Sequence, residues 1–285
     1  MTPPVNVMSV DVEDYFQVGA FERTIRREDW ERWPCRVEAN IDRVLALFAR
    51  HDLRATFFTL GWIAERYPGV VRAIVAEGHE IASHGYGHQR VSQLTPAQFR
   101  ADLTRAKGLL EDLAGAPVLG YRAPSFSIGQ DTLWALDILA ETGHRYSSSI
   151  YPIPHDHYGM PEAPRFPYRP ERCPDLLELP PTTVPLAGRN LPAAGGGYFR
   201  LLPYALSRHL LRRVTQGEGQ RAMFYFHPWE LDPGQPRIPG APLKSRLRHY
   251  VNLTRMESKL DRLCADFSWG RADQVYAAEL AATTT

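Results

Sequence analysis

The chain has 285 residues, enough for one large α/β domain or two small ones. Hydrophobic residues make up 44% and charged residues 23%, which is ordinary for a globular protein. A formal net charge of +1 gives no electrostatic reason to expect nucleic acid or an anionic membrane as partner. No run approaches the length of apolar residues that a membrane span needs, so none is expected.

The first residues and the cysteines bear on the compartment. The opening MTPPVNVMSV lacks a basic region followed by a long apolar run, so we expect no signal peptide. Cys35, Cys173 and Cys264 are odd in number and far apart, which fits neither a disulfide framework nor a zinc-knuckle spacing. We predict three free thiols in a cytoplasmic protein.

Short β-branched runs alternate with amphipathic segments along the first half of the chain. We expect strands at 5–10, 55–61 and 80–83, a strand with its exit loop at 118–124 and a strand with a turn at 144–150. Helices are expected at 37–51, 64–77, 95–110 and 131–142. Thr95-Pro96 is a favourable helix start, with a capping hydroxyl followed by proline. Strands that alternate with helices predict parallel βα units, hence a barrel or a doubly wound sheet.

The second half is rich in proline and less regular. It predicts a long loop at 151–170, strands at 176–183 and 222–226, helices at 203–214 and 250–267, and a frayed tail after Glu279. The run Gly195–Arg200 lacks the Gly-Lys-Ser/Thr of a phosphate-binding loop. We interpret it as a close-packed or substrate-contacting turn.

Two histidines follow the predicted strand at 80–83. His84 and His88 lie four residues apart with two glycines between them, which disfavours a helix interior and favours a bent loop. Neutral imidazole is a good ligand for zinc, iron, nickel and cobalt. The pair alone is weak evidence, since two histidines on a solvated loop look the same.

Three carboxylates follow the first predicted strand. Asp11, Glu13 and Asp14 lie within four residues at the end of a buried run, where acids are costly unless they are paired or bind a metal. Arg122 and Ser147–Ser149 also come directly after or at the end of predicted strands. Because the carboxyl ends of parallel strands meet on one face, these side chains are expected to share a site.

These motifs together resemble a known family. Asp11 after its strand, His84-Gly-Tyr-Gly-His88, Gly120-Tyr-Arg122-Ala-Pro124 and the strand-ending His227 are similar to the ordered motifs of polysaccharide deacetylases, the NodB-homology group or carbohydrate esterase family 4. Ser-Val-Asp-Val-Glu-Asp-Tyr-Phe, Leu-Pro-Pro-Thr-Thr, Gly-Gly-Gly-Tyr-Phe-Arg and His-Pro-Trp-Glu resemble the subgroup found with exopolysaccharide and exosortase genes. The resemblance implies one deacetylase domain over 1–285, in which 150–280 is a subgroup-specific extension that supplies the last strand and His227.

The resemblance implies a distorted (β/α) barrel that hydrolyses N-acetyl groups of amino sugars in a glycan. Asp11 would be the general base, His227 the general acid, and Arg122 the partner that keeps Asp11 ionised. His84 and His88 with one carboxylate would hold a divalent metal, zinc by default, with cobalt, nickel, manganese or iron as alternatives. Tyr198, Trp229 and Pro124 are candidates for contact with the sugar, and a lipid-linked glycan precursor is a candidate substrate.

Two departures from the family pattern matter. The family's opening motif has two adjacent aspartates, but here Val12 follows Asp11, so the metal ligand must be Glu13 or Asp14. Strand alternation favours Glu13, whereas a turn after Val12 favours Asp14, to which we give a slight preference. Ser147 stands where the family often has an aspartate. If that aspartate supports His227, then Ser147 weakens the general acid unless Glu178 or Asp232 substitutes for it.

Two other functions are compatible with the same residues. One is an amidohydrolase for a small cyclic amide or imide, which would need a narrower, closed pocket. The other is an inactive barrel that only binds carbohydrate; the presence of all the motif residues argues against it.

Overall fold

The computed structural model describes residues 4–155 and 159–282, and its centre is a curled, parallel sheet. Over these residues the sheet has eight strands in the order β10-β1-β2-β3-β4-β5-β6, with β9 paired to β1 as well. Their bounds are β1 (Asn6–Val12), β2 (Thr56–Thr59), β3 (Glu80–Ser83), β4 (Gly120–Tyr121), β5 (Tyr146–Ser147), β6 (Leu177–Glu178), β9 (Met223–Phe226) and β10 (Trp269–Gly270). The curled sheet with helices around it confirms the predicted distorted (β/α) barrel.

Strand β1 is the centre of this sheet. All seven of its residues are buried, as expected for a parallel strand covered on both faces. It pairs with β2 through Ser9–Val12 and with β9 through Val7–Val10. The far edges of the sheet also approach one another, because Thr182, which follows β6, donates its N–H to the carbonyl of Met223 at 3.2 Å.

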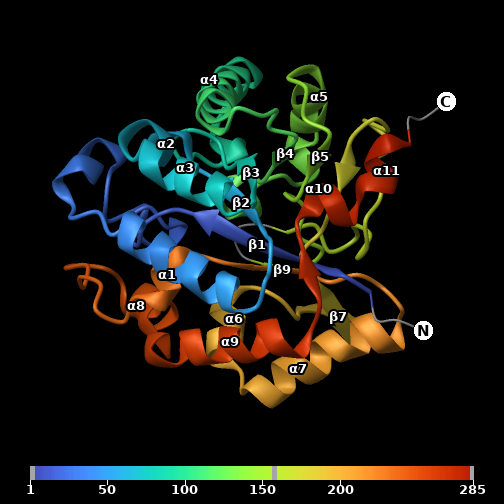
Figure 1. Cartoon of the computed structure of the whole chain (residues 1–285). Coiled ribbons are helices and arrows are strands. Elements are labelled where there is room, and N and C mark those ends of the chain that lie inside the picture. The colour runs from blue at the N-terminus through green and yellow to red at the C-terminus, as the bar shows by residue number, and fades with distance from the viewer. Residues whose placement is uncertain (1–3, 156–158, 283–285) are drawn as a thin grey trace.

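Amphipathic helices cover the sheet (Figure 1). In the first half they are α1 (Val37–Arg50), α2 (Gly61–Arg66), α3 (Pro68–Ala76), α4 (Pro96–Ala114) and α5 (Trp134–Glu141). Thr95 and Gln98 form a reciprocal capping box at the start of α4, as the Thr-Pro signal predicts. The single helix expected at 64–77 is two helices, because Pro68 forces the preceding Tyr67 out of helical geometry.

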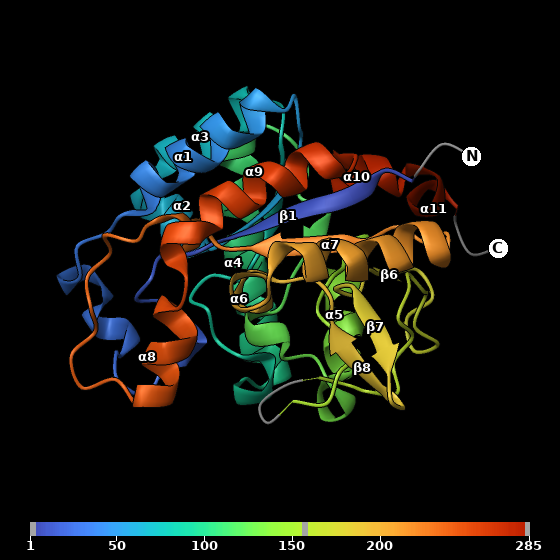
Figure 2. The ribbon, with the colours of Figure 1, turned by 90° about the horizontal axis from the view of Figure 1, so that it is seen from below.

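The second half adds α6 (Gly196–Leu201), α7 (Tyr204–Arg212), α8 (Leu243–Tyr250), α9 (Met256–Asp266), α10 (Ala272–Val275) and α11 (Ala277–Ala281), and the hairpin β7 (Thr183–Leu186) with β8 (Arg189–Pro192). The hairpin lies beside α7 (Figure 2), where Leu210 packs against the cluster that contains Val184. The helix expected at 250–267 begins only at Met256. All three cysteines are free, as predicted. Among the described helices, none combines the length and apolar character required to cross a bilayer.

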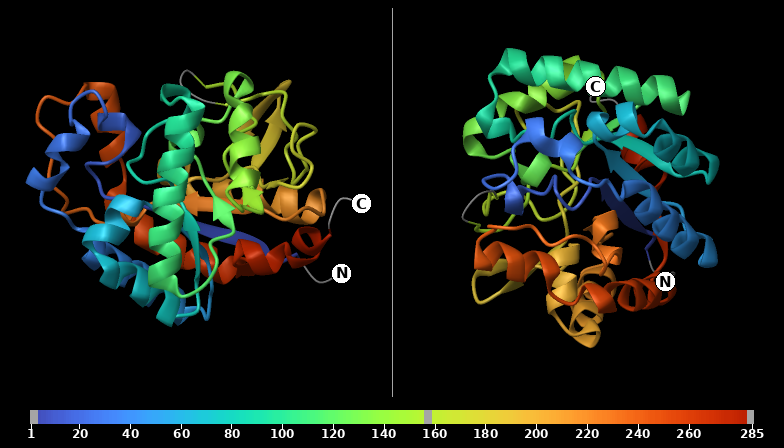
Figure 3. Two further views of the ribbon diagram at one scale, coloured as in Figure 1. Left: turned by 90° about the horizontal axis from the view of Figure 1, so that it is seen from above. Right: turned by 90° about the vertical axis from the view of Figure 1, so that its left-hand side faces the viewer.

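The carboxyl ends of the parallel strands face one end of the molecule. The right panel of Figure 3 looks onto this end, where the segment that follows β1 and helix α8 border it. Helix α8 and this segment are in contact, since the rings of Phe21 and His249 lie 4.7 Å apart. The side chains that end β1, β3, β4 and β9 therefore open into the same space.

Candidate active site

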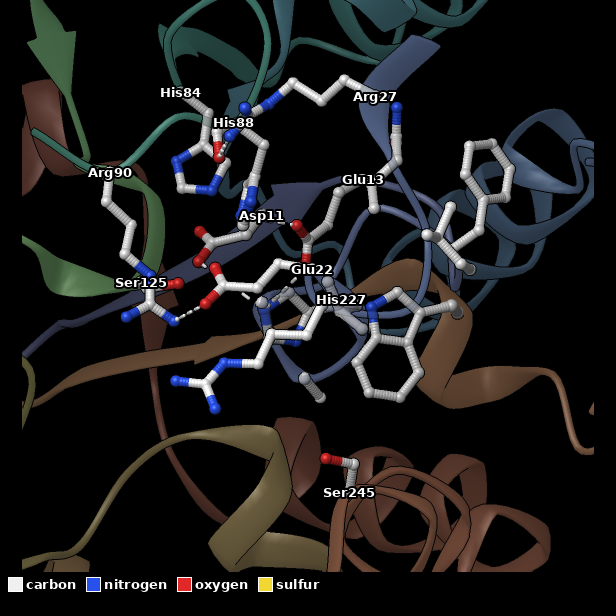
Figure 4. Close-up of a pocket in the computed structure, with 18 of the residues that line it drawn as sticks. Asp11, Glu13, Glu22, Arg27, His84, His88, Arg90, Ser125, His227 and Ser245 are labelled. Atoms are coloured by element: carbon white, nitrogen blue, oxygen red, sulfur yellow. Dashed lines mark hydrogen bonds and ion pairs between the residues drawn. The ribbon is translucent and has the colours of Figure 1, made fainter. Parts of the chain in front are cut away.

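A pocket of about 890 Å³ opens at the carboxyl ends of the strands. Its floor includes Asp11, Glu13, His84, His88 and His227 (Figure 4). These residues come from β1, from the loop after β3 and from the end of β9, so the sheet brings together the predicted acids and histidines.

Glu13, His84 and His88 form a compact set of ligand atoms. One atom from each lies within 4.8 Å of the others, and all three residues are buried. The loop that carries the histidines bends at Gly85, whose φ is +72°. A Cβ at Gly85 would lie 2.8 Å from Oδ2 of Asp102, which accepts the Tyr86 N–H at 2.9 Å. Glycine is therefore required at this bend, as the sequence suggested.

Arg27 holds the loop at the second histidine, His88. The sequence did not predict this role for Arg27. His88 has a φ of +52°, an uncommon conformation for a residue with a side chain. The Arg27 guanidinium donates to the carbonyls of Gly87 and His88 and thereby fixes this part of the loop. No local motif indicates the contact, because Arg27 lies about sixty positions away in the chain.

The histidines and the carboxylate have the chemistry of a metal site. Nδ1 of His84 donates to the Arg122 carbonyl at 2.8 Å, which leaves Nε2 as the free ligand atom. Burial lowers the pKa of His84 to about 4, so this imidazole is neutral at physiological pH. Burial alone would raise the pKa of Glu13, but His88, His227 and His84 lower it to about 2, so this carboxylate is anionic. A divalent cation takes such a set of ligands.

The side chains of Glu13 and His88 face one another, but their geometry is not that of a hydrogen bond. Oε2 of Glu13 lies 2.8 Å from Nε2 of His88, yet this oxygen has no hydrogen-bond partner among the described residues. Buried carboxylate oxygens rarely go unpaired, and an explanation is required where they do. A cation shared by the two atoms would satisfy both, so the residues present fit a metal ion.

The geometry favours Glu13 over Asp14, contrary to our slight preference from the sequence. The oxygens of Asp14 accept the backbone N–H groups of Tyr15 and Arg36, and Arg36 caps helix α1. Asp14 therefore anchors backbone outside the ligand set. Strand β1 ends at Val12 and a turn over 14–17 follows, so Asp11 and Glu13 both line the pocket while Asp14 lies outside its lining.

Asp11 is held by a fully buried arginine. Nη1 of Arg122 lies 2.6 Å from Oδ1 of Asp11 and 2.9 Å from Oγ of Ser9. Nη2 of Arg122 donates to Oγ of Ser148 at 2.9 Å, so the guanidinium is held by β1 and by the residue that follows β5. This contact matches the pairing that the resemblance implies, and the second Asp11 oxygen, Oδ2, lies 3.9 Å from Nε2 of His227.

His227 has its own acidic partner, Glu230. Nδ1 of His227 lies 2.9 Å from Oε1 of Glu230, whose other oxygen accepts from Nε of Arg200 at 2.6 Å. Burial by itself would lower the pKa of His227, but Glu13, Glu230 and Asp11 raise it to about 9. His227 is therefore an imidazolium at neutral pH, with Nε2 directed at the carboxylates of the floor.

The glycine run at 195–197 makes room for this partner. A Cβ at Gly196 would lie 1.9 Å from Oε1 of Glu230, whereas a Cβ at Gly197 would meet nothing within 4 Å. Gly195 has a φ of +108°, which few other residues adopt. Of the two interpretations of this run, close packing is the one observed, and the run also begins helix α6.

Neither replacement expected for the missing family aspartate contacts His227. Glu178 accepts the backbone N–H groups of Ser149 and Ile150, and Asp232 pairs with Arg36 and Arg43. Ser147 donates to Oγ of Ser149 at 2.8 Å. The acid that contacts His227 is instead Glu230, which the His-Pro-Trp-Glu turn places three residues after the histidine. This short spacing is the sequence signal that could have identified Glu230.

Only one of the three predicted sugar contacts lines the pocket. Trp229 does, but with 5% of its surface exposed it offers little area for stacking on a sugar, and its ring stacks on His227 and His249. Tyr198 and Pro124 lie outside the residues that line the pocket. Tyr198 belongs to α6, which starts where Gly196 packs against Glu230.

Comparison with known families agrees with the motifs. Residues 30–147 match the model for polysaccharide deacetylase, and residues 148–277 match one described as a domain of unknown function, DUF3473. Residues 30–147 are thus similar to polysaccharide deacetylases, and the second match covers most of the segment 150–280 that the resemblance assigns to an extension. The second match contains β9 and His227, whereas β1 with Asp11 and Glu13 precedes both matches.

Two curated relatives that match part of this chain are named deacetylases. A peptidoglycan deacetylase of Helicobacter pylori is 33% identical over 113 residues, 40% of this chain and 38% of that protein. A chitooligosaccharide deacetylase of Bradyrhizobium is 33% identical over 109 residues, 38% of this chain and 47% of that protein. The matched part thus spans less than half of either relative.

Two solved structures share the fold across nearly the whole chain. One from Mycobacterium smegmatis, classed as a polysaccharide deacetylase, has a TM-score of 0.60 and 21% identity and covers 100% of this chain and 98% of that one. The PuuE allantoinase has a TM-score of 0.61 and 18% identity and covers 97% and 91%. At these identities the likeness concerns the fold alone.

Proposed function

We propose that this protein is a metal-dependent deacetylase that hydrolyses N-acetyl groups of amino sugars in a glycan. The observation that carries the proposal is the arrangement in one pocket of a paired acid, Asp11, an imidazolium, His227, and the ligand set of Glu13, His84 and His88. The names of the curated relatives support the same chemistry.

Asp11 would act as the general base. Its Oδ1 is engaged by Arg122 at 2.6 Å, which fixes the orientation of the carboxylate. The free Oδ2 faces the pocket on the side of His227 and would remove a proton from the attacking water.

His227 would act as the general acid. Protonation of the departing amine requires an imidazolium, and three surrounding carboxylates keep His227 in that form. Glu230 fixes the ring by accepting from Nδ1, so that Nε2 is the nitrogen that gives up its proton. The 21% of the His227 side chain that is exposed lies in the pocket.

Glu13, His84 and His88 would hold the metal. Once bound there, a divalent cation polarises the acetyl carbonyl and stabilises the negative charge that develops on its oxygen. Zinc is our default; cobalt, nickel, manganese and iron also accept two imidazoles and a carboxylate. The three protein ligands leave positions for substrate, as catalytic sites require.

We place the reaction in exopolysaccharide biosynthesis, with a cytoplasmic, lipid-linked glycan precursor as the candidate substrate. The motifs shared with the exopolysaccharide-associated subgroup support this assignment. A small cyclic amide is the alternative substrate, and an inactive carbohydrate-binding barrel is the alternative to an enzyme. A pocket of about 890 Å³ is near the upper end of small-molecule sites, which favours a glycan over a small ring.

The test is acetate release from N-acetylated chitooligosaccharides, with the free amine of the product identified by mass spectrometry. Metal-stripped protein, protein reloaded with zinc or cobalt, and His84→Ala are compared. Acetate and amine in equal amounts only from the reloaded wild type support the proposal. Hydrolysis of allantoin-like rings without acetate from any sugar would support the small-amide alternative, and sugar binding that His84→Ala leaves unchanged would support the inactive barrel.

A further inference from the structure

The walls of the pocket carry an excess of arginine. Lining residues include Arg23, Arg26, Arg27, Arg90 and Arg248, against a single acid above the floor, Glu22. Arg90 pairs with Glu22 at 2.9 Å, as Figure 4 shows, and Arg26 pairs with Glu28 and Asp29 outside the lining.

Three of these arginines form no ion pair with the described residues, although Glu22 and Asp102 lie near enough to act electrostatically on Arg27. Arg27 donates only to backbone carbonyls, and Arg23 and Arg248 form no hydrogen bond or ion pair through their side chains with the described residues. The carboxylates of the floor face other groups: Asp11 pairs with Arg122, and Glu13 faces His88 and His227. Nε of Arg90 likewise has no partner in the part of the chain that the structure describes.

The unpaired arginines come from segments that are held together. Arg23 follows Phe21, and Arg248 precedes His249 on α8; the rings of Phe21 and His249 are 4.7 Å apart. Ser245 of the same helix also lines the pocket and faces it in Figure 4. The positive wall is therefore built into the fold from two parts of the chain that lie more than two hundred residues apart.

The pocket is poor in the groups that usually bind neutral sugars. Sugar rings stack on open aromatic faces, but every aromatic residue that lines this pocket is at least nine-tenths buried: Phe16 1%, Trp30 3%, Trp229 5%, Phe126 6% and Tyr225 8% exposed. Guanidinium groups instead match carboxylates and phosphates through paired hydrogen bonds.

We infer that the glycan bound here carries an anionic group, a carboxylate or a phosphate, which the arginine wall contacts while the acetamide lies over Asp11 and His227. The inference rests on the proposed function for the position of the acetamide. An oxyanion at this wall accepts hydrogen bonds from guanidinium groups that form no ion pair with the described residues, and a neutral chitin-like substrate has no such group to offer.

The test compares three N-acetylglucosamine ligands: neutral chitotetraose, a hyaluronan tetrasaccharide that carries glucuronate, and an alkyl diphosphate ester of N-acetylglucosamine. Binding is measured by calorimetry and acetate release by kcat/KM, each at low and high salt. The test variant is Arg23→Gln with Arg248→Gln. The matched control is Arg246→Gln, an exposed arginine on the same helix that does not line the pocket.

We expect one anionic ligand to be preferred over chitotetraose by about tenfold or more in binding, with the preference reduced by salt. The double variant should bring this ratio close to one, and the control should keep it. A preference for hyaluronan identifies a uronate, and a preference for the diphosphate ester identifies a phosphate. Equal binding of neutral and anionic ligands by the wild type overturns the inference even if acetate is released. Absence of acetate from all three overturns the proposed function, while the binding ratios still decide the inference.

Discussion

Oε1 of Glu230 lies 2.9 Å from Nδ1 of His227, three residues earlier in the chain, and also accepts the His227 backbone N–H at 3.0 Å. One carboxylate oxygen thus fixes both the main chain and the ring of the proposed general acid. The acid that orients this histidine comes from the turn that carries it, and not from the strand of Ser147.

Glu230→Gln should lower kcat roughly 10²-fold with little change in KM, because the ring loses the partner that orients it and favours its protonated form. Removing that negative charge lowers the pKa of His227, so activity should fall at a lower pH on the alkaline side. The measurement is a pH–rate profile. Asp232→Asn is the control, since it removes another buried acid of the same segment that does not contact His227. A variant that loses stability but keeps the wild-type profile would assign Glu230 a purely structural role.

Gly196→Ala should reproduce the loss of activity of Glu230→Gln, since a Cβ at 1.9 Å from Oε1 must displace the carboxylate. Gly197→Ala is the matched control: it has open space, lies in α6, and should leave kcat unchanged while stabilising the protein by roughly 0.5–1 kcal/mol. Turnover and thermal unfolding are measured for both. Equal activity of the two variants would contradict the close contact between Gly196 and Glu230.

Glu13→Gln and Asp14→Asn should separate metal binding from stability. The first removes the anionic ligand and should abolish stoichiometric zinc binding. The second removes an acceptor for backbone N–H groups and should cost about 1–3 kcal/mol in the free energy of unfolding while zinc still binds. Zinc is measured by calorimetry and stability by urea unfolding. If Asp14→Asn loses zinc and Glu13→Gln retains it, our assignment of the ligand is reversed.

Glu178 predicts a pH-dependent stability. Burial raises the pKa of this carboxyl to about 7, so the folded protein keeps a proton that the unfolded chain releases above its ordinary pKa. Stability therefore decreases as the pH rises between the unfolded and folded values, by roughly 1.4 kcal/mol for each pH unit. Glu178→Gln removes this titration, so urea unfolding at pH 5 and 7 should differ less in the variant than in the wild type. The same pH dependence in both proteins would exclude Glu178 as its source.

The sequence predicted those parts of the site that depend on strand ends. Asp11, His84, Arg122 and His227 each follow or end a recognisable buried run, and parallel pairing brings such ends together. It could not decide between Glu13 and Asp14, because that choice depends on the residue at which a turn begins. Arg27 and Arg200 were missed since they act across long sequence distances, and Tyr198 was assigned to the sugar because glycine runs also occur in binding loops.

The helices show a similar contrast: their buried faces were predicted, but some of their ends were not. Helix α1 has bounds within one residue of those predicted, since its buried residues keep helical spacing along its whole length. The expected helices at 64–77 and 250–267 were too long, because apolar spacing continues across Pro68 and across the irregular segment 251–255. Periodicity indicates which face is buried, but it does not report where the backbone turns.

The most direct test titrates zinc into metal-free protein and follows acetate release from an N-acetylated oligosaccharide, with Asp11→Asn alongside. The wild-type rate should rise with zinc and level off at one equivalent. Asp11→Asn should bind the same equivalent but turn over ~10²-fold more slowly or worse, as expected for a lost general base. Acetate release that does not depend on zinc, or one equivalent of zinc bound with no acetate from any sugar, would contradict the assignment of this pocket as a metal-dependent deacetylase.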